Sequence, residues 1–349
     1  MTAASVPIRP ADHRPVRAVS ATVALCAIVA AAFVLSMTVG RYPVSPLQVV
    51  QALAGGGDPA TGYVVTGLRL PRAAVGVAAG ALLALSGALT QSFARNPLAS
   101  PDVIGVTQGA SAAAVAAVVL GGGTYALSPT VSSYGIPVAA TLGGLSATAL
   151  VFGLAWRGDL APDRVVLVGI GVAGVAGAAV SWLLIAASIG EAGQAAVWLA
   201  GSLNGRGTQQ LWPLLVVAAV TVPAAALLRR PLAVSALGDD VARSLGVRLR
   251  SMQAATVAVA AVMAAGAVAA SGPVEFVALV APQLAVRLVG GARIPLAASA
   301  ATGAALVTLA DVVGRTVTSH EIPVGLVTAA LGAPYLIWLL ARRRREPTS

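Results

Sequence analysis

The chain contains no lysine: all 22 of its Lys+Arg positions are arginine. A phosphate-binding G-x-x-x-x-G-K-[ST] loop is therefore excluded, and no side chain can form a Schiff base. The histidines, His13 in the N-terminal tail and His320 in a predicted outer loop, lie too far apart in topology to share a metal. Neither lies at membrane depth, where an intramembrane serine protease would need one. Cys26 is the single cysteine and excludes an intrachain disulfide. We expect no catalytic residue, no metal and no cofactor.

Aromatic residues make up 4% of the chain and charged residues 10%, whereas apolar residues reach 58%. From Ala73 to Phe93 no residue is charged. This stretch has about 20 residues, the length that an α-helix needs to cross a ~30 Å hydrocarbon core. Glycine is abundant and suits helices that approach closely in lipid. The composition therefore predicts an all-α polytopic membrane protein.

Polar or Pro/Gly-rich breaks divide the chain into about ten predicted spans. They cover residues 18–39, 72–93, 104–120, 136–156, 165–189, 209–228, 252–271, 273–290, 295–314 and 322–341. We expect one transmembrane domain, 18–341, between an N-terminal tail, 1–17, and a basic C-terminal tail, 342–349. The first span resembles a signal peptide at its start, but its apolar run is longer than a usual signal.

Arginine is distributed unevenly between the two sides of the predicted topology. With the N-terminus inside, 17 arginines fall on the inner side and 5 on the outer side. The positive-inside rule then predicts a cytoplasmic-membrane protein with both termini in the cytoplasm. Topology explains the net charge of +10, so no nucleic-acid partner is needed to account for it. We expect the lipid bilayer to surround the predicted spans.

A polar turn with two prolines, residues 95–102, lies at the inner end of the second span. Non-helical backbone near membrane depth is tolerated where protein buries it or water lines it. A gate or vestibule is one such place, and an ordinary Pro-containing loop is the alternative.

The longest polar stretch between spans, LGDDVARSLGVRLRS (237–251), lies within a predicted inner segment of about 235–250. Gly238, Asp239 and Asp240 can open a short helix and Gly246 can close it. Val241, Leu245 and Val247 would give it an apolar side, which favours a partner surface. The alternative is a helix that lies on lipid headgroups.

Seven segments, in order, resemble the cobalamin and ferric-siderophore importer permease family (FecCD or BtuC-like), from about Arg69 to Arg344. They are RLPR (69–72), LSGALTQSFARNPLASPDVIG (85–105), VWLAGSLNGRG (197–207), LGDDVARSLGV (237–247), GPVEFVALVAPQLAVRLVG (272–290), ADVVGR (310–315) and IPVGLVTAALGAPYLIWLLARR (322–343). The versions SPDVIG, SLNGRG and APQLAVRL more closely resemble the second permease of ferric-enterobactin-type importers.

The resemblance implies a non-enzymatic, ten-span permease subunit that pairs with a second permease. It also implies two cytoplasmic ATPase subunits and an external siderophore-binding protein. By the same resemblance, Arg69, Arg72 and Arg315 dock the binding protein, although arginines that anchor span ends at headgroups are the alternative. Asn96, Pro97 and Leu98 fall at the inner gate. The residues that the resemblance implies for coupling to the ATPase subunits are Gly238, Asp239, Asp240, Ser244, Leu245 and Gly246.

The chain departs from the family pattern between residues 275 and 283. Glu275 and Ala278 replace two glycines, and Gln283 replaces a histidine, as in the enterobactin-like subgroup. A carboxylate at Glu275 must be paired, protonated or hydrated, so we expect it near the outer boundary. Asp311 is predicted to pair with Arg315 at i,i+4.

We therefore expect an ATP-driven permease for a ferric siderophore. A cobalamin or haem permease of the same family is the alternative. An ion-coupled secondary transporter is a more distant alternative, because the spans carry few central charges and no convincing repeat is found. A scaffold protein would lack an ATPase-docking helix.

Overall fold

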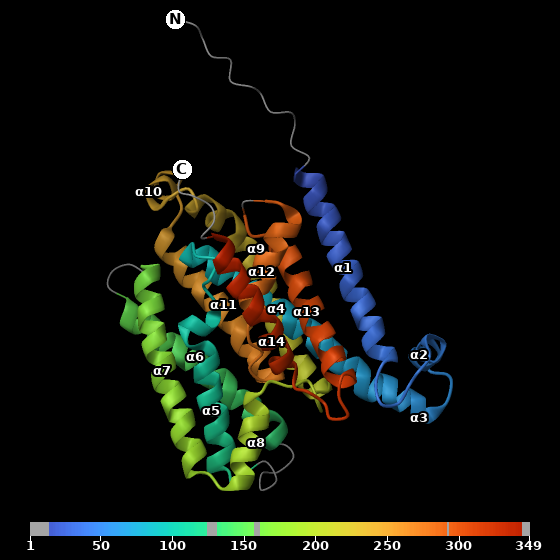
Figure 1. The fold of residues 1–349 in the computed structure, drawn as a ribbon. Helices are drawn as coiled ribbons and strands as arrows, with labels where there is room; N and C mark the ends of the chain where they lie inside the picture. Colours follow the sequence, from blue (N-terminus) through green and yellow to red (C-terminus); the bar gives the residue numbers. More distant parts are fainter. Residues whose placement is uncertain (1–13, 124–130, 157–160, 292, 344–349) are drawn as a thin grey trace, which may run out of the picture.

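The computed structural model describes residues 14–123, 131–156, 161–291 and 293–343, and these residues form helices and no strand. The predicted tail up to residue 13, with His13, lies outside the described residues, as do Arg157 and the C-terminal tail from residue 344. The elements, labelled in Figure 1 where there is room, are α1 (Arg14–Thr38), α2 (Pro46–Leu53), α3 (Pro59–Gly62), the π-helical η1 (Tyr63–Arg69), α4 (Leu70–Ala94), the 3₁₀ turn η2 (Pro101–Ile104), α5 (Val106–Leu120), the π-helical η3 (Val131–Gly135), α6 (Ile136–Ala155), α7 (Pro162–Ala186), α8 (Ile189–Leu199), α9 (Thr208–Ser235), α10 (Asp239–Ser244), α11 (Leu249–Ser271), α12 (Val277–Val289), α13 (Leu296–Thr316) and α14 (Val324–Arg343).

Among the described residues, 7 helices are long and apolar enough to cross a bilayer. They are α1, α6, α7, α9, α11, α13 and the continuous run Pro59–Ala94, whose last part is α4. The shorter apolar helices α5, α12 and α14 correspond to the remaining predicted spans. The predicted all-α, ten-span fold class is thereby confirmed. In Figure 1, α10 and the start of α1 lie at one end of the bundle, here named the α10 end, and α8, α2 and α3 lie toward the opposite end, the α8 end.

Helices α4 and α11 form the centre of the bundle. In their most apolar windows 78% and 72% of residues are buried, against 11% for both α1 and α7. Small residues allow the backbones to approach: a Cβ at Gly80 would lie 2.3 Å from the carbonyl oxygen of Gly303 on α13. A Cβ at Gly87 would lie 1.7 Å from the carbonyl oxygen of Ala278 on α12. Van der Waals contact at such crossings holds helices together in lipid.

Helix α9 is longer than predicted and continues to Ser235 rather than ending at residue 228. Arg229 and Arg230 directly follow the predicted span, but long arginine side chains can reach the membrane boundary while the backbone stays helical. Pro231 lies inside the helix as well. A proline at this position removes one helical hydrogen bond, and the helix continues past it.

Helix α12 begins at Val277, later than the predicted residue 273, because the segment 272–276 is not helical. Gly272 has φ +72°, and Pro273 has no backbone N–H to donate. The segment runs back along α14: a Cβ at Gly325 would lie 2.8 Å from the Pro273 carbonyl oxygen, and one at Gly332 would lie 2.3 Å from Cβ of Phe276. Glu275 is exposed on this non-helical segment beside α14, and its place relative to the outer boundary stays a prediction.

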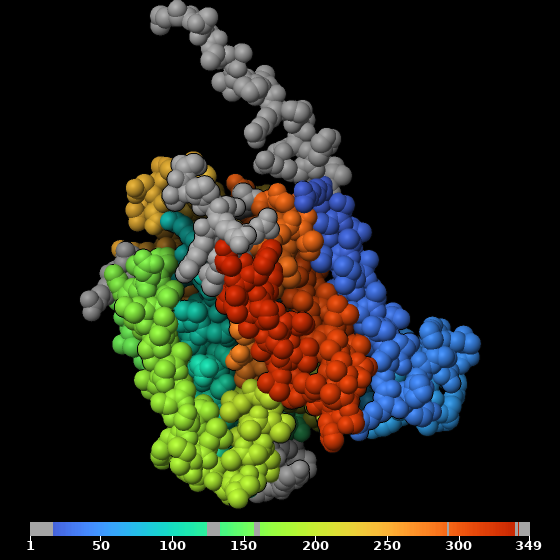
Figure 2. Space-filling model, in the orientation of Figure 1, coloured from blue at the N-terminus to red at the C-terminus, as the bar shows by residue number. Residues whose placement is uncertain are grey.

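Helices α7 and α14 stand on opposite sides of one face of the molecule, with α5 and α6 visible between them in Figure 2. Large apolar side chains are exposed on both helices. They are Leu167, Ile170, Val175, Trp182 and Ile185 on α7, and Leu326, Leu331, Ile337 and Trp338 on α14. Such a face requires lipid or another membrane-spanning subunit as its neighbour.

Candidate functional site

An arginine–carboxylate cluster joins α4 to α13 at the α8 end. Arg72 donates from Nε and Nη2 to Oδ1 of Asp311 at 3.2 and 2.9 Å, and from Nη1 to Oε2 of Glu321 at 3.1 Å. Arg315 lies 3.1 Å from the other oxygen of Asp311 and donates to the hydroxyl of Ser36 at 2.8 Å. The Asp311 side chain is 5% exposed, and both of its oxygens are paired.

The predicted pair between Asp311 and Arg315 is confirmed by this geometry. The contact of Asp311 with Arg72 was not predicted, because 239 residues separate the two positions and no local spacing indicates it. A buried carboxylate with two guanidinium partners is a strong constraint, since removing one partner would leave an uncompensated charge. The cluster therefore fixes the relative position of α4 and α13 at the α8 end.

Arg69 points into the protein rather than toward its surface. Its Nη1 donates to the carbonyl oxygens of Met37 and Thr38 at 2.6 and 3.2 Å, and its Nη2 donates to the carbonyl of Tyr42. The residue is 7% exposed. A Cβ at Gly40 would lie 2.8 Å from Nη2 of Arg69, so the chain passes directly over the guanidinium. Arg69 thus satisfies the carbonyls at the end of α1, which lack helical partners.

All of the arginines predicted to dock a binding protein lie at the α8 end, and their guanidiniums already have partners within the chain. Their docking role stays a prediction. Arg72 is the one whose partner is most accessible, since the side chain of Glu321 is 28% exposed. Exchange of Glu321 for a carboxylate of another protein would leave the Arg72–Asp311 contact intact.

At the α10 end, the predicted gate residues form a tight turn after α4. Arg95 ends the helix in the left-handed region, with φ +49°. The side-chain oxygen of Asn96 accepts from the backbone N–H of Leu98 at 2.9 Å, which is an Asx turn. Asn96 is exposed, whereas Pro97 and Leu98 are half-buried.

The gate turn contacts the predicted ATPase-coupling segment directly. Arg95 Nη2 donates to the carbonyl oxygen of Ser235 at 2.8 Å and forms an ion pair with Asp239 at the start of α10. Both side chains are close to half-exposed, at 44% and 41%. Such a pair contributes little stability in water. Its value lies in joining two segments that are distant in sequence.

Helix α10 follows the predicted pattern in most respects. Gly238 has φ +112° and Gly246 has φ +81°, so both ends use backbone conformations that favour glycine. Asp240 pairs with Arg243 at 3.1 Å, and the Ser244 hydroxyl donates to the Val241 carbonyl at 2.9 Å.

The exposed apolar stripe of α10 consists of Leu237, Val241 and Leu245, which are 62%, 43% and 63% exposed. Val247, which we expected on this apolar side, is instead half-buried against the core. Ala242 faces inward and is fully buried. Val241 lies within α10, whereas Leu237 precedes the helix and Leu245 is its C-cap residue, so the stripe covers α10 and both of its flanks.

A buried amide chain between α4 and α12 was not predicted either. Gln283 donates from Nε2 to Oε1 of Gln91 at 2.7 Å, and Gln91 donates to the Leu279 carbonyl at 2.9 Å. Gln91 is 2% exposed. The glutamine at 283, identified in the sequence as a subgroup feature, therefore has a structural partner on the helix that precedes the gate turn.

Comparison with known proteins gives a consistent result. A model of the FecCD transport family matches residues 28–342. The chain is 39% identical over 308 residues to the ferric enterobactin transport system permease protein FepG of Escherichia coli, which covers 88% of this chain and 91% of the relative. It is 38% identical over 294 residues to the cobalamin import system permease protein BtuC of Halobacterium salinarum, which covers 82% of this chain and 76% of the relative.

A solved structure of a metal-chelate type ABC transporter in an inward-facing conformation matches with a TM-score of 0.78 at 28% identity, and it covers 92% of this chain and 98% of that chain. Helical architecture, sequence relatives and family model all agree over most of the chain. These findings set aside the secondary-transporter and scaffold alternatives. The chain is an ABC importer permease and belongs to the FecCD transport family.

Proposed function

We propose that this permease imports a ferric siderophore across the cytoplasmic membrane, driven by two cytoplasmic ATPase subunits and supplied by an external binding protein. The observation that carries the proposal is the junction at the α10 end. There a helix with an exposed apolar stripe is joined through Arg95 to the turn that holds Asn96, Pro97 and Leu98. A chain without a nucleotide-binding loop must receive the effect of ATP hydrolysis from outside, through a contact that biases its pathway.

The orientation follows from charge. The arginine-rich side of the topology, with 17 of the 22 arginines, includes α10 and both predicted tails. The positive-inside rule assigns this side to the cytoplasm, where ATPase subunits reach α10. Attachment of a cytoplasmic ATPase to α10 tests this assignment. The gate residues then lie at the cytoplasmic mouth of the pathway and the arginine–carboxylate cluster at the outer mouth.

Docking of the binding protein at the outer mouth is tested by Arg72→Gln and Glu321→Gln. Arg72→Gln removes the cation that a partner carboxylate would contact, so binding-protein stimulation of ATPase activity should fall by about two- to fivefold, the size typical of partly exposed ion pairs. Glu321→Gln removes the competing carboxylate and should leave stimulation unchanged or raise it. A matching fall in the unstimulated ATPase activity or in the yield of folded Arg72→Gln protein would mean that Arg72 only holds α4 and α13 together through Asp311.

Arg69 is not suited to a charge-reversal test of docking. A carboxylate at this position would face the carbonyl oxygens of Met37, Thr38 and Tyr42 without a donor. The resulting unsatisfied buried charge would disturb folding itself.

The proposed partner in the membrane is a different permease that covers the α7 and α14 face. Two unlike halves can shape an asymmetric cavity for a large, irregular chelate, whereas a two-fold dimer repeats one surface. Three motifs support a ferric chelate over cobalamin: Ser100-Pro101-Asp102, Ser202-Leu203-Asn204-Gly205 and Ala281-Pro282-Gln283. They resemble the second permease of enterobactin-type systems.

Reconstitution in vesicles tests both the substrate and the pairing. The chain with its ATPase and binding protein should give no uptake of a radiolabelled ferric siderophore, and addition of the second permease should restore uptake. Robust uptake by the single permease would overturn the heterodimer. Uptake of cobalamin or haem without uptake of any ferric chelate would overturn the substrate class and leave the permease assignment intact.

A further inference from the structure

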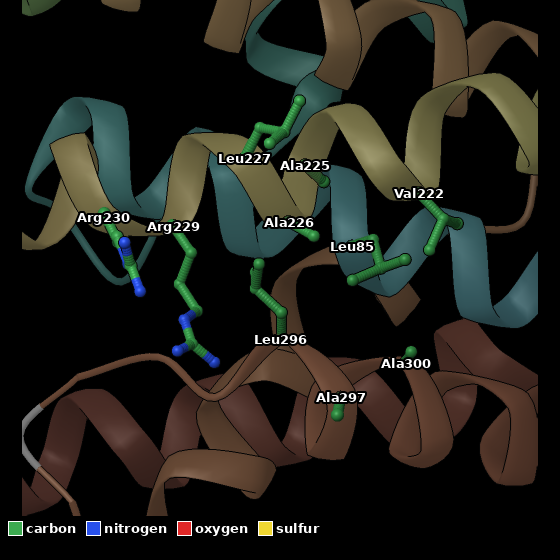
Figure 3. A pocket seen from close by; sticks show the side chains of 10 residues that line it. All are labelled: Leu85, Val222, Ala225, Ala226, Leu227, Arg229, Arg230, Leu296, Ala297 and Ala300. Atoms are coloured by element: carbon green, nitrogen blue, oxygen red, sulfur yellow. The ribbon is translucent and has the colours of Figure 1, made fainter.

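A groove opens between α9, α4 and α13 toward the α10 end. Figure 3 shows its lining, and its volume is about 530 Å³. Leu85 of α4 lines the groove in the middle of the bundle, and Leu296 lies where α13 begins. The remaining lining comes from Val222, Ala225, Ala226, Leu227, Arg229 and Arg230 of α9, and from Ala297 and Ala300 of α13.

The groove is apolar along its length and cationic at one end. Alanines on both facing helices leave the space open, because they fill little of the gap between the backbones. Arg229 and Arg230 follow the apolar residues of α9, and in Figure 3 both guanidiniums extend from α9 to the side on which α13 begins. The volume falls within the range of small-molecule sites, about 300–1,000 Å³.

Neither arginine forms a hydrogen bond or ion pair with the described part of the chain, and both are exposed. The contrast with Arg72, Arg95 and Arg315 is clear, since each of these has a carboxylate partner. Two adjacent unpaired guanidiniums favour an anion with several oxygens, and arginine binds phosphate with parallel hydrogen bonds.

The surroundings of the groove indicate where such an anion comes from. Helix α9 is long and apolar enough to cross a bilayer, and only 17% of its most apolar window is buried. Two of its exposed apolar side chains, Val222 and Leu227, line the groove itself. The groove therefore opens toward the bilayer, and its occupant must be apolar along the helices and anionic at the membrane surface.

We propose that this groove binds one anionic phospholipid, with an acyl chain between α9 and α13 and the phosphate on Arg229 and Arg230. Basic pockets between transmembrane helices bind acidic head groups in this way. A zwitterionic lipid fits the apolar part equally well but offers the arginines no net negative charge. Head-group charge is therefore the property that the site selects.

The experiment measures phospholipid retained by the purified full-length chain after exchange from mixed phosphatidylglycerol and phosphatidylcholine micelles, by native mass spectrometry. The wild type should retain phosphatidylglycerol selectively. The double variant Arg229→Gln, Arg230→Gln should lower this retention by about tenfold, given the contribution of each arginine at an anionic surface. Arg250→Gln, an exposed arginine at the same end outside the groove, is the matched control and should retain phosphatidylglycerol as the wild type does.

A second variant tests the acyl chain separately. Ala226→Leu with Ala297→Leu fills the groove at two exposed positions and keeps both arginines. It should also lose the selective retention. Unchanged retention in either double variant would overturn the proposal, and so would equal retention of phosphatidylcholine by the wild type. Competition by inorganic phosphate without any effect of groove filling would show an anion site that holds no lipid, which also overturns it.

Discussion

Replacing Gly87 by alanine is expected to destroy the packing of α4 against α12. The added Cβ would lie 1.7 Å from the carbonyl oxygen of Ala278 and 2.9 Å from its Cα. Both are backbone atoms, so no flexible side chain can move aside, and a helix as a whole must shift. Overpacking of rigid contacts costs about 1–3 kcal/mol and sometimes more. Displacement here also separates Gln91 from the Leu279 carbonyl, one turn further along the same crossing.

The measurement is the yield of monodisperse protein on size exclusion in detergent, followed by the apparent melting temperature of what remains. We expect a strongly reduced yield and a melting temperature lower by roughly 6 °C or more. Gly171→Ala is the matched control, since a Cβ at this position of α7 meets nothing within 4 Å. A Gly87→Ala protein that elutes and melts like the wild type would contradict the close crossing of α4 and α12.

Replacing Leu245 by aspartate is expected to release the ATPase subunits from the permease. Leu245 is 63% exposed and belongs to the apolar stripe with Leu237 and Val241. A charge in the centre of an apolar contact removes the apolar area that Leu245 would bury there and adds the cost of desolvating the carboxylate. Retention of the ATPase in a pull-down should fall by about tenfold or more, the effect of removing an interface hot spot.

Ser251→Asp adds the same charge at the same end of the molecule, on the exposed surface of α11. This control should retain the ATPase as the wild type does. Both variants should insert into the membrane equally, because neither position is buried. If Leu245→Asp kept its ATPase at normal affinity, α10 would be reassigned to the lipid surface, the alternative that the sequence left open.

The helices themselves could be predicted from the sequence because a bilayer leaves few choices. A backbone in hydrocarbon must satisfy its own polar groups, so an uncharged run such as 73–93 has to be helical. The ends of these helices were harder to predict, because near the membrane boundary the backbone can also satisfy its polar groups outside a helix. At α9 the arginines lie within the helix, and at α12 the segment 272–276 is not helical, so the helix begins only at Val277.

The candidate sites were predicted where the contacts are local. The pair of Asp311 with Arg315 follows from their i,i+4 spacing, and the turn at Asn96 follows from its own residues. Contacts between distant segments could not be predicted from a single sequence. Arg95 with Asp239 is such a contact, and its partners are 144 residues apart. The burial of Arg69 was not predicted, because an arginine at a span end is consistent with either surface anchoring or burial among carbonyls.

The burial of Arg69 has a consequence for the order in which the protein is made. Its guanidinium binds carbonyls of Met37, Thr38 and Tyr42, so the contact needs only α1 and the beginning of the next membrane-spanning run. These helices leave the ribosome before α13 does, and N-terminal units generally fold first during synthesis. The first helical hairpin can therefore close in the membrane before α13 exists. Arg72 must wait for Asp311, and its charge stays uncompensated until translation has passed that residue.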